Sequence, residues 1–339
     1  MVNIRRYLSS NFAKSFLTIF LPIYFIVSLV FLIQISSLTA KINLTFYELL
    51  KLYILSLPEI VFYTLPISFI AALSNVLGRL SQDNELIALH ALGIQARAIL
   101  KIFFLLAFLF SILLLAISFI TMPLGVQAYN AFKSEKRAEA NFTLIPGKIG
   151  QKFGDFYIYV KDKNDNSFHN LVIYNQTSEG EEQFFSSQKG ELLHEEGTML
   201  LKLSDGYGYT YTQEKLQEAQ YKELKVYDQN RDEGFEFYTI QSYWAQALTD
   251  QKRMHKALFN LFISLIPLLS VYLIAAFTII NPRYQKNHTM LTTFVVILVL
   301  YLIASVLQKN GTLPLLLGAS AVLWLTGSWL FKKRVSRYF

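Results

Sequence analysis

The hydrophobic residues of this chain fall into long blocks that are separated by polar stretches. A helix needs about 20 apolar residues to cross a bilayer, and six blocks approach or exceed that length. They predict membrane spans at residues 16–38, 60–77, 102–124, 257–280, 289–307 and 312–331. The second span can start as early as Phe46, and it contains Pro58 and Pro66, which are expected to bend or interrupt a helix.

The stretch between the second and third blocks, residues 76–101, is only half apolar and predicts a short surface helix. Ser81 is its expected N-cap and Gly93 its expected C-terminal stop, while Asp83 and Glu85 place negative charge in its first turn. The helix is too short and too polar to span a membrane.

One face of this predicted helix is apolar. That face is expected to carry Leu86, Leu89, Leu92 and Ile94, with Glu85 and His90 nearer the other face. Periodicity alone leaves two interpretations equally open: a surface that docks a partner, or an amphipathic helix lying on its own membrane domain.

The segment between the third and fourth spans, residues 125–251, changes to a strand-like pattern. Short runs rich in aromatic and β-branched residues, such as FGDFYIYV and NLVIY, alternate with turn signals such as Ser204-Asp205-Gly206. Roughly eight such runs predict a β-sandwich, most simply a jelly roll, with helical stems at 123–140 and 241–256. We therefore expect spans one to three in 1–124, the β domain in 125–251 and spans four to six in 252–339.

Composition supports a polytopic membrane protein. The chain is 53% hydrophobic with a mean hydropathy of +0.35, which is too apolar for an ordinary soluble domain. Residues 125–251 hold 13 Lys and Arg against 20 Asp and Glu, a net charge of −7, whereas the remainder holds 18 against 4, a net charge of +14. An acidic water-soluble domain is thus inserted into a basic membrane protein. The first apolar block of the chain, residues 16–38, is predicted to be a retained anchor and not a cleaved signal peptide.

The distribution of basic residues predicts the orientation. One side collects Arg5, Arg6, Lys14, Arg79, Arg97, Lys101, Arg283, Lys286, Lys332, Lys333, Arg334 and Arg337. The short loops of the other side hold only Lys41, Lys51 and Lys309. Because positive charge marks the cytoplasmic side, both termini and the 76–101 helix are expected in the cytoplasm, with 125–251 outside.

The sequence shows no pattern for catalysis. No G-x-x-x-x-G-K-[ST] phosphate loop is present, so we expect the chain not to bind ATP in that way. There is no cysteine, and His194-Glu195-Glu196 is not a zinc-binding H-E-x-x-H, so neither a metal nor a cofactor is expected. The spans are almost free of ionisable residues apart from Glu59, which disfavours an intramembrane enzyme.

A polar cluster at the outer end of the fourth span contradicts the charge rule. It consists of Lys252, Arg253, His255 and Lys256, and Lys41 has a similar place at the end of the first span. Two interpretations remain: cations that snorkel to lipid phosphates, and a site for an anionic amphiphile.

Several motifs together resemble a known family. Leu57-Pro58-Glu59, Leu65-Pro66-Ile67, the run from Leu77 to Leu86 and His90-Ala91-Leu92-Gly93-Ile94 closely resemble the second span and cytoplasmic helix of the lipopolysaccharide export permeases, the LptF/LptG family. The layout of three spans, a periplasmic β-jelly roll and three spans matches along the whole chain. Asn281-Pro282-Arg283, and Asn310-Gly311 with Leu313-Pro314, look more like LptF than LptG.

The resemblance implies a permease subunit of an ABC transporter in the inner membrane of a Gram-negative bacterium. Such a permease extracts lipopolysaccharide from the outer leaflet and passes it through its jelly roll toward the outer membrane. The implied partners are an LptG-like second permease, an LptB-like ATPase dimer that holds ATP-Mg, and an LptC-like membrane-anchored jelly-roll protein. No nucleic-acid partner is expected. Pairing with a second copy of this chain stays open.

The resemblance also implies site residues. The family's coupling helix, which docks on the ATPase, corresponds to residues 81–93, with Asp83, Glu85, Leu86, Leu89, His90 and Gly93 as its expected contributors. The basic residues of the family at the outer ends of the first and fourth spans are not reproduced position by position, and the nearest candidates for lipopolysaccharide phosphate contacts are Lys41, Lys252, Arg253 and Lys256. The alternative function is a non-transporting membrane sensor or scaffold whose β domain binds an envelope ligand.

Overall fold

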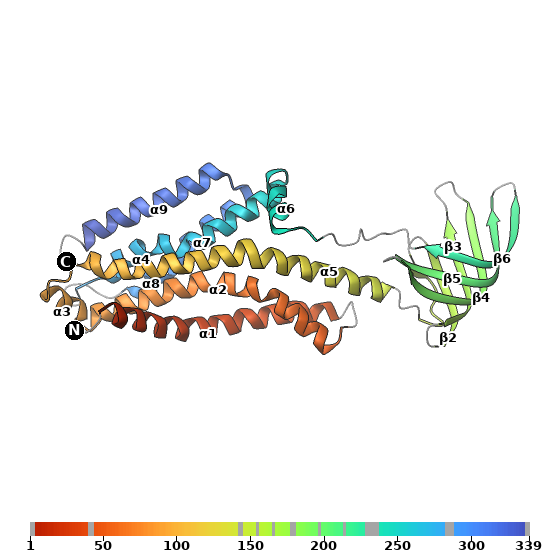
Figure 1. Ribbon diagram of the computed structural model, residues 1–339, viewed down its shortest axis with the longest axis horizontal. Helices are drawn as coiled ribbons and strands as arrows, with labels where there is room; N and C mark the ends of the chain where they lie inside the picture. The colour runs from red at the N-terminus through yellow and green to blue at the C-terminus, as the bar shows by residue number, and fades with distance from the viewer. Residues whose placement is uncertain are drawn as a thin grey trace. The chain divides into compact units, whose positions relative to one another are not determined.

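The structure is a computed structural model that describes residues 4–39, 44–141, 145–153, 156–164, 167–176, 181–195, 198–212, 215–227, 237–281 and 288–335. It divides into two compact units. The helical unit contains Met1–Thr39, Thr45–Tyr129 and Tyr238–Phe339, and the β unit contains Ala40–Leu44 and Asn130–Phe237. Figure 1 shows the helices and strands of each unit.

Six helices of the helical unit are long and apolar enough to cross a membrane, which confirms the six predicted spans. They are α1 (Ile4–Thr39), α2 (Phe46–Gln82), α4 (Ala96–Ala116), α7 (Gln251–Thr278), α8 (Thr289–Asn310) and α9 (Leu313–Arg334). The second span begins at the early limit, Phe46, and Pro58 and Pro66 both lie inside α2 without interrupting it.

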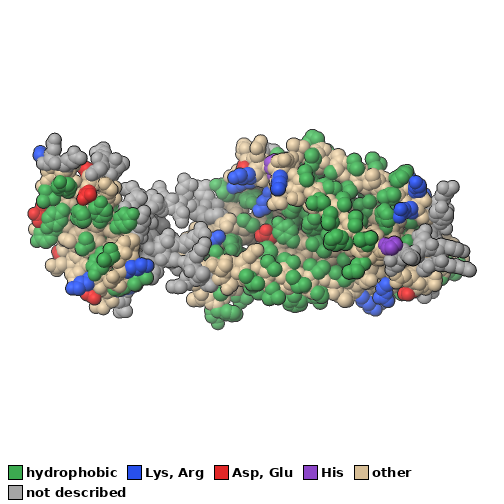
Figure 2. Space-filling view, turned by 180° about the vertical axis from the view of Figure 1, so that it is seen from behind, with side chains coloured by type: hydrophobic (Ala, Val, Ile, Leu, Met, Phe, Trp, Pro, Cys, Tyr) green, Lys and Arg blue, Asp and Glu red, His purple; other side chains and the backbone are tan. Residues whose placement is uncertain are grey.

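Helices α2 and α7 form the centre of this unit. About 72% of the most apolar window of α2 and 67% of that of α7 are buried, against 28% or less in the other four spans. Phe62 and Phe69 of α2 and Phe262 of α7 are fully buried. Figure 2 shows hydrophobic side chains across the middle of the helical unit, with Lys and Arg side chains toward its two ends. The outer faces of the other four helices are therefore apolar and available to lipid or to other subunits.

The third span continues beyond α4 through a π-helical segment, η1 (Ile117–Thr121), into α5 (Met122–Asn141). A π-helical turn changes the backbone hydrogen-bond pattern of a helix locally. Here the indole Nε1 of Trp244 donates to the carbonyl of Phe119 at 2.9 Å. Trp244 lies on α6 (Ile240–Ala245), which leads through the short η2 (Gln246–Leu248) to α7.

Gly125 lets α5 approach α2 closely. A Cβ atom at this position would lie 2.6 Å from the backbone carbonyl oxygen of Leu55, so only glycine fits without a shift of the backbone. This contact fixes α5 against the part of α2 that is far from α3.

The β unit is a single antiparallel sheet of six strands in sequential order. The strands are β1 (Gln151–Phe153), β2 (Phe156–Asn164), β3 (Ser167–Gln176), β4 (Glu182–Glu195), β5 (Thr198–Tyr211) and β6 (Leu216–Tyr227). One face buries an apolar cluster that includes Ile158, Val160, Leu171, Ile173, Leu201 and Leu203. The inserted all-β unit is thus confirmed.

The strand connections differ from those of the expected jelly roll. Each described strand pairs with its neighbours in sequence, so these strands form a meander without Greek-key connections. Several differences lead from the expected eight strands to the six described ones. EQFFSS and GELLH merge into β4, TMLLKL and GYGYTYT merge into β5, and the short β1 is an additional strand. The last expected strand, FEFYTI, is not formed in its described part, since Ile240 already begins α6.

The turn predicted at Ser204-Asp205-Gly206 is also wrong, because β5 continues through it. Asp205 adopts a left-handed backbone with φ 52°, as does Asn170 of β3 with φ 52°. Gly206 follows where a Cβ would collide with the carbonyl of Ser186 and the hydroxyl of Tyr221. The turn-forming residues therefore serve a local irregularity within a long strand, not a strand end.

Candidate functional site

The predicted surface helix exists as α3 (Glu85–Ala91), between α2 and α4. The prediction of Ser81 as its N-cap is wrong because α2 continues to Gln82. The Ser81 hydroxyl instead donates at 3.0 Å to the carbonyl of Leu77 or at 2.9 Å to that of Thr278 in α7. The N-cap position of α3 is Asn84, which has a left-handed backbone with φ 58° and no side-chain capping bond.

As predicted, Gly93 forms the turn that follows the C-terminus of α3, and its φ is 81°. The amide of Gly93 donates to the carbonyl of His90 at 2.9 Å, and the amide of Ile94 donates to that of Leu89 at 3.1 Å. These two bonds form a Schellman motif, in which the residue after the helix cap is usually glycine. The Nδ1 atom of His90 bonds the carbonyl of Ile94 at 2.6 Å, so His90 stabilises the same turn.

The inner face of α3 packs on the helical unit. Leu86 is 1% exposed, and Leu89 and Ile94 pack against the same apolar core. Leu92 was expected on this face, but its side chain is 77% exposed. The helix ends at Ala91 and turns at Gly93, so the helical period no longer applies at Leu92.

Glu85 is held by its own chain. The hydroxyl of Tyr7 on α1 donates to its Oε2 atom at 2.8 Å. Tyr7 is separated from Glu85 by 78 positions, and nothing in the sequence pattern pointed to it. Asp83, the other acidic candidate, is exposed at the end of α2.

The outer side of α3 presents an apolar surface that we call the α3 patch, made of Ile87, Ala88, Ala91 and Leu92. All four residues are exposed, with Ile87 at 40% and Leu92 at 77%. Exposed apolar side chains gathered at one place on a protein surface commonly mark a contact with another protein or with a membrane. Of the predicted contributors, Leu86 and Leu89 pack on the helical core, His90 and Gly93 form the turn after α3, Glu85 bonds Tyr7, and Asp83 is exposed. The residues of the α3 patch were not among them.

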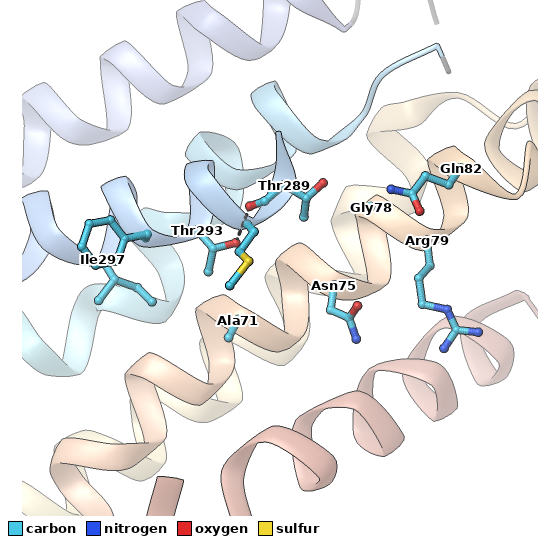
Figure 3. A pocket seen from close by; sticks show the side chains of 10 residues that line it. Ala71, Asn75, Gly78, Arg79, Gln82, Thr289, Thr293 and Ile297 are labelled. Carbon is cyan, nitrogen blue, oxygen red and sulfur yellow. Dashed lines mark hydrogen bonds between the residues drawn. The ribbon is translucent and has the colours of Figure 1, made fainter. Parts of the chain in front are cut away.

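A pocket of about 550 Å³ lies beside this region between α2 and α8 (Figure 3). Asn75, Arg79 and Gln82 supply its polar wall on α2, opposite Thr289 and Thr293 on α8. In Figure 3, Asn75 and Arg79 project from the same side of α2. The Asn75 amide donates to the hydroxyl of Ser15 on α1 at 3.0 Å.

Close contact of α2 and α8 closes one side of the pocket. A Cβ at Gly78 would lie 3.0 Å from the Thr289 side chain, so glycine lets the two helices meet. The Thr293 hydroxyl oxygen lies 2.7 Å from the carbonyl oxygen of Thr289 and 2.5 Å from the hydroxyl oxygen of the buried Ser74. We call this pocket the polar notch, after its polar wall of Asn75, Arg79, Gln82, Thr289 and Thr293.

The basic cluster at the start of α7 holds residues in different situations. The guanidinium of Arg253 bonds the side chain of Gln246, lies 3.7 Å from the Asp250 carboxylate and stacks 5.0 Å from the ring centre of Tyr243. Lys252 is exposed and Lys256 half-buried, and neither forms an ion pair with any described residue. Lys41 lies outside the described residues.

Arg253 therefore holds α6 and η2 on α7, which leaves the two lysines as the cations of this cluster that can reach a ligand. No group of three or more His, Asp and Glu residues that could hold a metal ion exists within the described part of the chain.

Comparison with known proteins agrees with this architecture. Residues 6–333 match the family described as lipopolysaccharide export system permease LptF/LptG. No curated protein matches the sequence.

Proposed function

Because the chain belongs to the LptF/LptG family of lipopolysaccharide export permeases, we propose that it is a permease subunit of an ABC transporter. In this proposal it extracts lipopolysaccharide from the outer leaflet of the inner membrane and passes it through its β unit. An LptC-like membrane-anchored jelly-roll protein receives the lipid from that unit. The family match covers LptF and LptG alike, and we keep LptF as the proposed assignment on the residues after α7 and α8.

The α3 patch carries this proposal, because it gives a separate ATPase a place to act. Ile87 and Leu92 are exposed, while Leu86 on the opposite face is buried in the helical core. A partner that pushes on the patch therefore pushes on α2, through Leu86 and the short link from Gln82 to Glu85. We propose an LptB-like ATPase dimer, which binds ATP-Mg, as that partner.

The proposed orientation places α3 in the cytoplasm. The ends of the spans on the α3 side carry most of the basic residues of the helical unit, namely Arg5, Arg6, Lys14, Arg79, Arg97, Lys101, Lys332, Lys333 and Arg334. Arg283, Lys286 and Arg337, which the sequence also assigns to that side, lie outside the described residues. Positive charge beside short loops favours the cytoplasmic side, so the β unit is placed in the periplasm.

We propose that a second permease contacts the polar notch between α2 and α8. Asn75, Arg79 and Gln82 are exposed on α2, and polar side chains are costly against lipid but stabilising between helices. The chain has no cysteine, so a single cysteine at Asn75 or Gln82 gives crosslinking without background. Crosslinks to a different permease support the heterodimer, and crosslinks to a second copy support a homodimer.

Lys252 and Lys256 are the proposed contacts for lipopolysaccharide phosphate, because Arg253 is already engaged within the chain. Replacing both lysines with glutamine should weaken photo-crosslinking of lipopolysaccharide, since charge-assisted contacts to phosphate are lost. The melting temperature should stay unchanged. Undiminished crosslinking would leave snorkelling to lipid phosphates as the role of these lysines.

The decisive experiment is purification of the tagged chain from membranes, with its partners identified by mass spectrometry. We expect a second permease and a nucleotide-binding ATPase with the wild-type chain. The double variant Ile87→Glu, Leu92→Glu should lose the ATPase and keep the permease. Leu216→Glu is the control, since Leu216 is an exposed leucine of the β unit, with an exposure of 68% against 77% for Leu92.

Recovery of no ATPase with the wild-type chain would contradict the proposal and favour the sensor or scaffold. Recovery of the ATPase with both the double variant and the control would show that the α3 patch is not its docking surface.

A further inference from the structure

A second hollow near α3, separate from the polar notch, lies between α1 and α4. It has a volume of about 610 Å³, within the range of small-molecule sites. Its lining includes Arg5 and Ser9 of α1 and Lys101, Ile102, Leu105 and Leu106 of α4. We call it the α1–α4 groove.

The lining of this groove changes from charged to apolar along the helices. Arg5 is the second residue of α1, and Lys101 lies five residues after the start of α4, about 7.5 Å along the helix. Leu105 and Leu106 lie about 6 to 7.5 Å deeper than Lys101. The groove therefore offers cations near the helix ends and hydrocarbon toward the middle of the membrane span.

Among the described residues, the cations of the groove have no acidic partner. No acidic residue lines it. Neither Arg5 nor Lys101 forms an ion pair with any residue that the structure describes, and the Ser9 hydroxyl forms no hydrogen bond there. Glu85, the acid of the neighbouring α3, accepts from Tyr7. Two cations and a hydroxyl group from two helices thus line a space whose described lining holds no acidic residue.

We propose that the α1–α4 groove binds an anionic phospholipid of the leaflet on the α3 side. Its phosphate lies between Arg5 and Lys101, the Ser9 hydroxyl donates to a phosphate oxygen, and one acyl chain runs along Ile102, Leu105 and Leu106. A soluble phosphate compound would leave the apolar part of the groove unfilled. Bound lipid joins α1, whose Tyr7 donates to Glu85 of α3, to α4, which follows α3 in the chain.

This site is distinct from the proposed path of lipopolysaccharide, which belongs to the opposite leaflet. It depends on neither the ATPase nor the second permease. Its test therefore uses the purified chain, and its result is independent of whether the α3 patch docks an ATPase.

The test compares lipid binding to the wild-type chain, to R5Q/K101Q and to the control K332Q/K333Q in nanodiscs of phosphatidylcholine with added phosphatidylglycerol. The control removes two exposed cations from the same side of the helical unit, at the end of α9. A basic residue near an anionic surface strengthens binding roughly fivefold, so R5Q/K101Q should bind phosphatidylglycerol about 25-fold more weakly in native mass spectrometry. The control should bind it like the wild type.

Three results would overturn the proposal. Equal loss in R5Q/K101Q and K332Q/K333Q would show a general attraction to the membrane surface. Equal binding of glycerol phosphate and phosphatidylglycerol to the wild-type chain would show a site for soluble phosphate. Unchanged binding to R5Q/K101Q would show that the groove is not the site, and because both side chains are exposed, these substitutions should leave the fold intact.

Discussion

Replacing Leu92 with alanine tests the α3 patch most directly. Complete burial of a leucine side chain contributes about 1.5 to 3 kcal/mol, and 77% of the Leu92 side chain is still exposed in the free chain. Burial of that fraction by a partner contributes about 1.2 to 2.3 kcal/mol. The variant should therefore bind the ATPase about 7- to 50-fold more weakly.

The assay titrates purified ATPase onto the permease in nanodiscs and measures the melting temperature of the same samples. Leu92→Ala should change the free energy of unfolding by no more than about 0.5 kcal/mol, because this residue is mostly exposed in the free chain. Leu86→Ala is the matched control on the inner face, and its buried side chain predicts a loss of about 2 to 5 kcal/mol in stability. Wild-type affinity in Leu92→Ala, or a loss of stability like that of Leu86→Ala, would refute the reasoning.

Two further substitutions test the contacts that hold the helical unit together. Tyr7→Phe removes the hydrogen-bond donor to Glu85, and an exposed bond of this kind contributes about 1 kcal/mol or less. The amides of α3 should therefore exchange up to about fivefold faster in hydrogen-exchange mass spectrometry. Unchanged exchange would show that the bond does not hold α3. Gly125→Ala places a methyl group 2.6 Å from the Leu55 carbonyl oxygen and should lower the free energy of unfolding by about 1 to 3 kcal/mol. The control Gly318→Ala, where no atom lies within 4 Å of the added Cβ, should leave that free energy unchanged or raise it. Equal effects of the two substitutions in thermal unfolding would contradict the close contact.

The sequence predicted the number and order of the spans because bilayer thickness sets a minimum length for an apolar helix. It did not distinguish α2 and α7 as the buried centre, since the apolar character of a span does not follow its burial: exposed α9 is less apolar than buried α2, and exposed α4 is more apolar. The β unit was predicted from alternation and turn residues, but Asp205 and Gly206 also suit an irregularity inside a strand. Local residue preference could not decide between a turn and a continuing strand.

The candidate site was predicted in its local features and missed in its long-range ones. Gly93 was correctly placed because a helix stop depends on a backbone conformation that glycine adopts most readily. The prediction of Ser81 as an N-cap was wrong, because its hydroxyl donates to the backbone carbonyl of Thr278, which lies 197 positions away in the chain. The engagement of Arg253 by Gln246 and of Glu85 by Tyr7 likewise required the folded structure.

The continuity of α2 gives the proposed docking helix α3 a physical route to distant parts of the helical unit. Helix α2 has 37 residues, about 55 Å, and neither of its inner prolines interrupts it. Near α3, Ser81 joins it to the end of α7, and about 40 Å away its Leu55 carbonyl contacts Gly125 of α5. In the proposed function, a displacement at α3 therefore reaches α7 through the near end of α2. It reaches the third span both directly, because α4 follows α3 in the chain, and through the far end of α2. The π-helical segment η1, which precedes Gly125, interrupts the regular α-helical hydrogen bonding of that third span, so we expect such a displacement to be absorbed there.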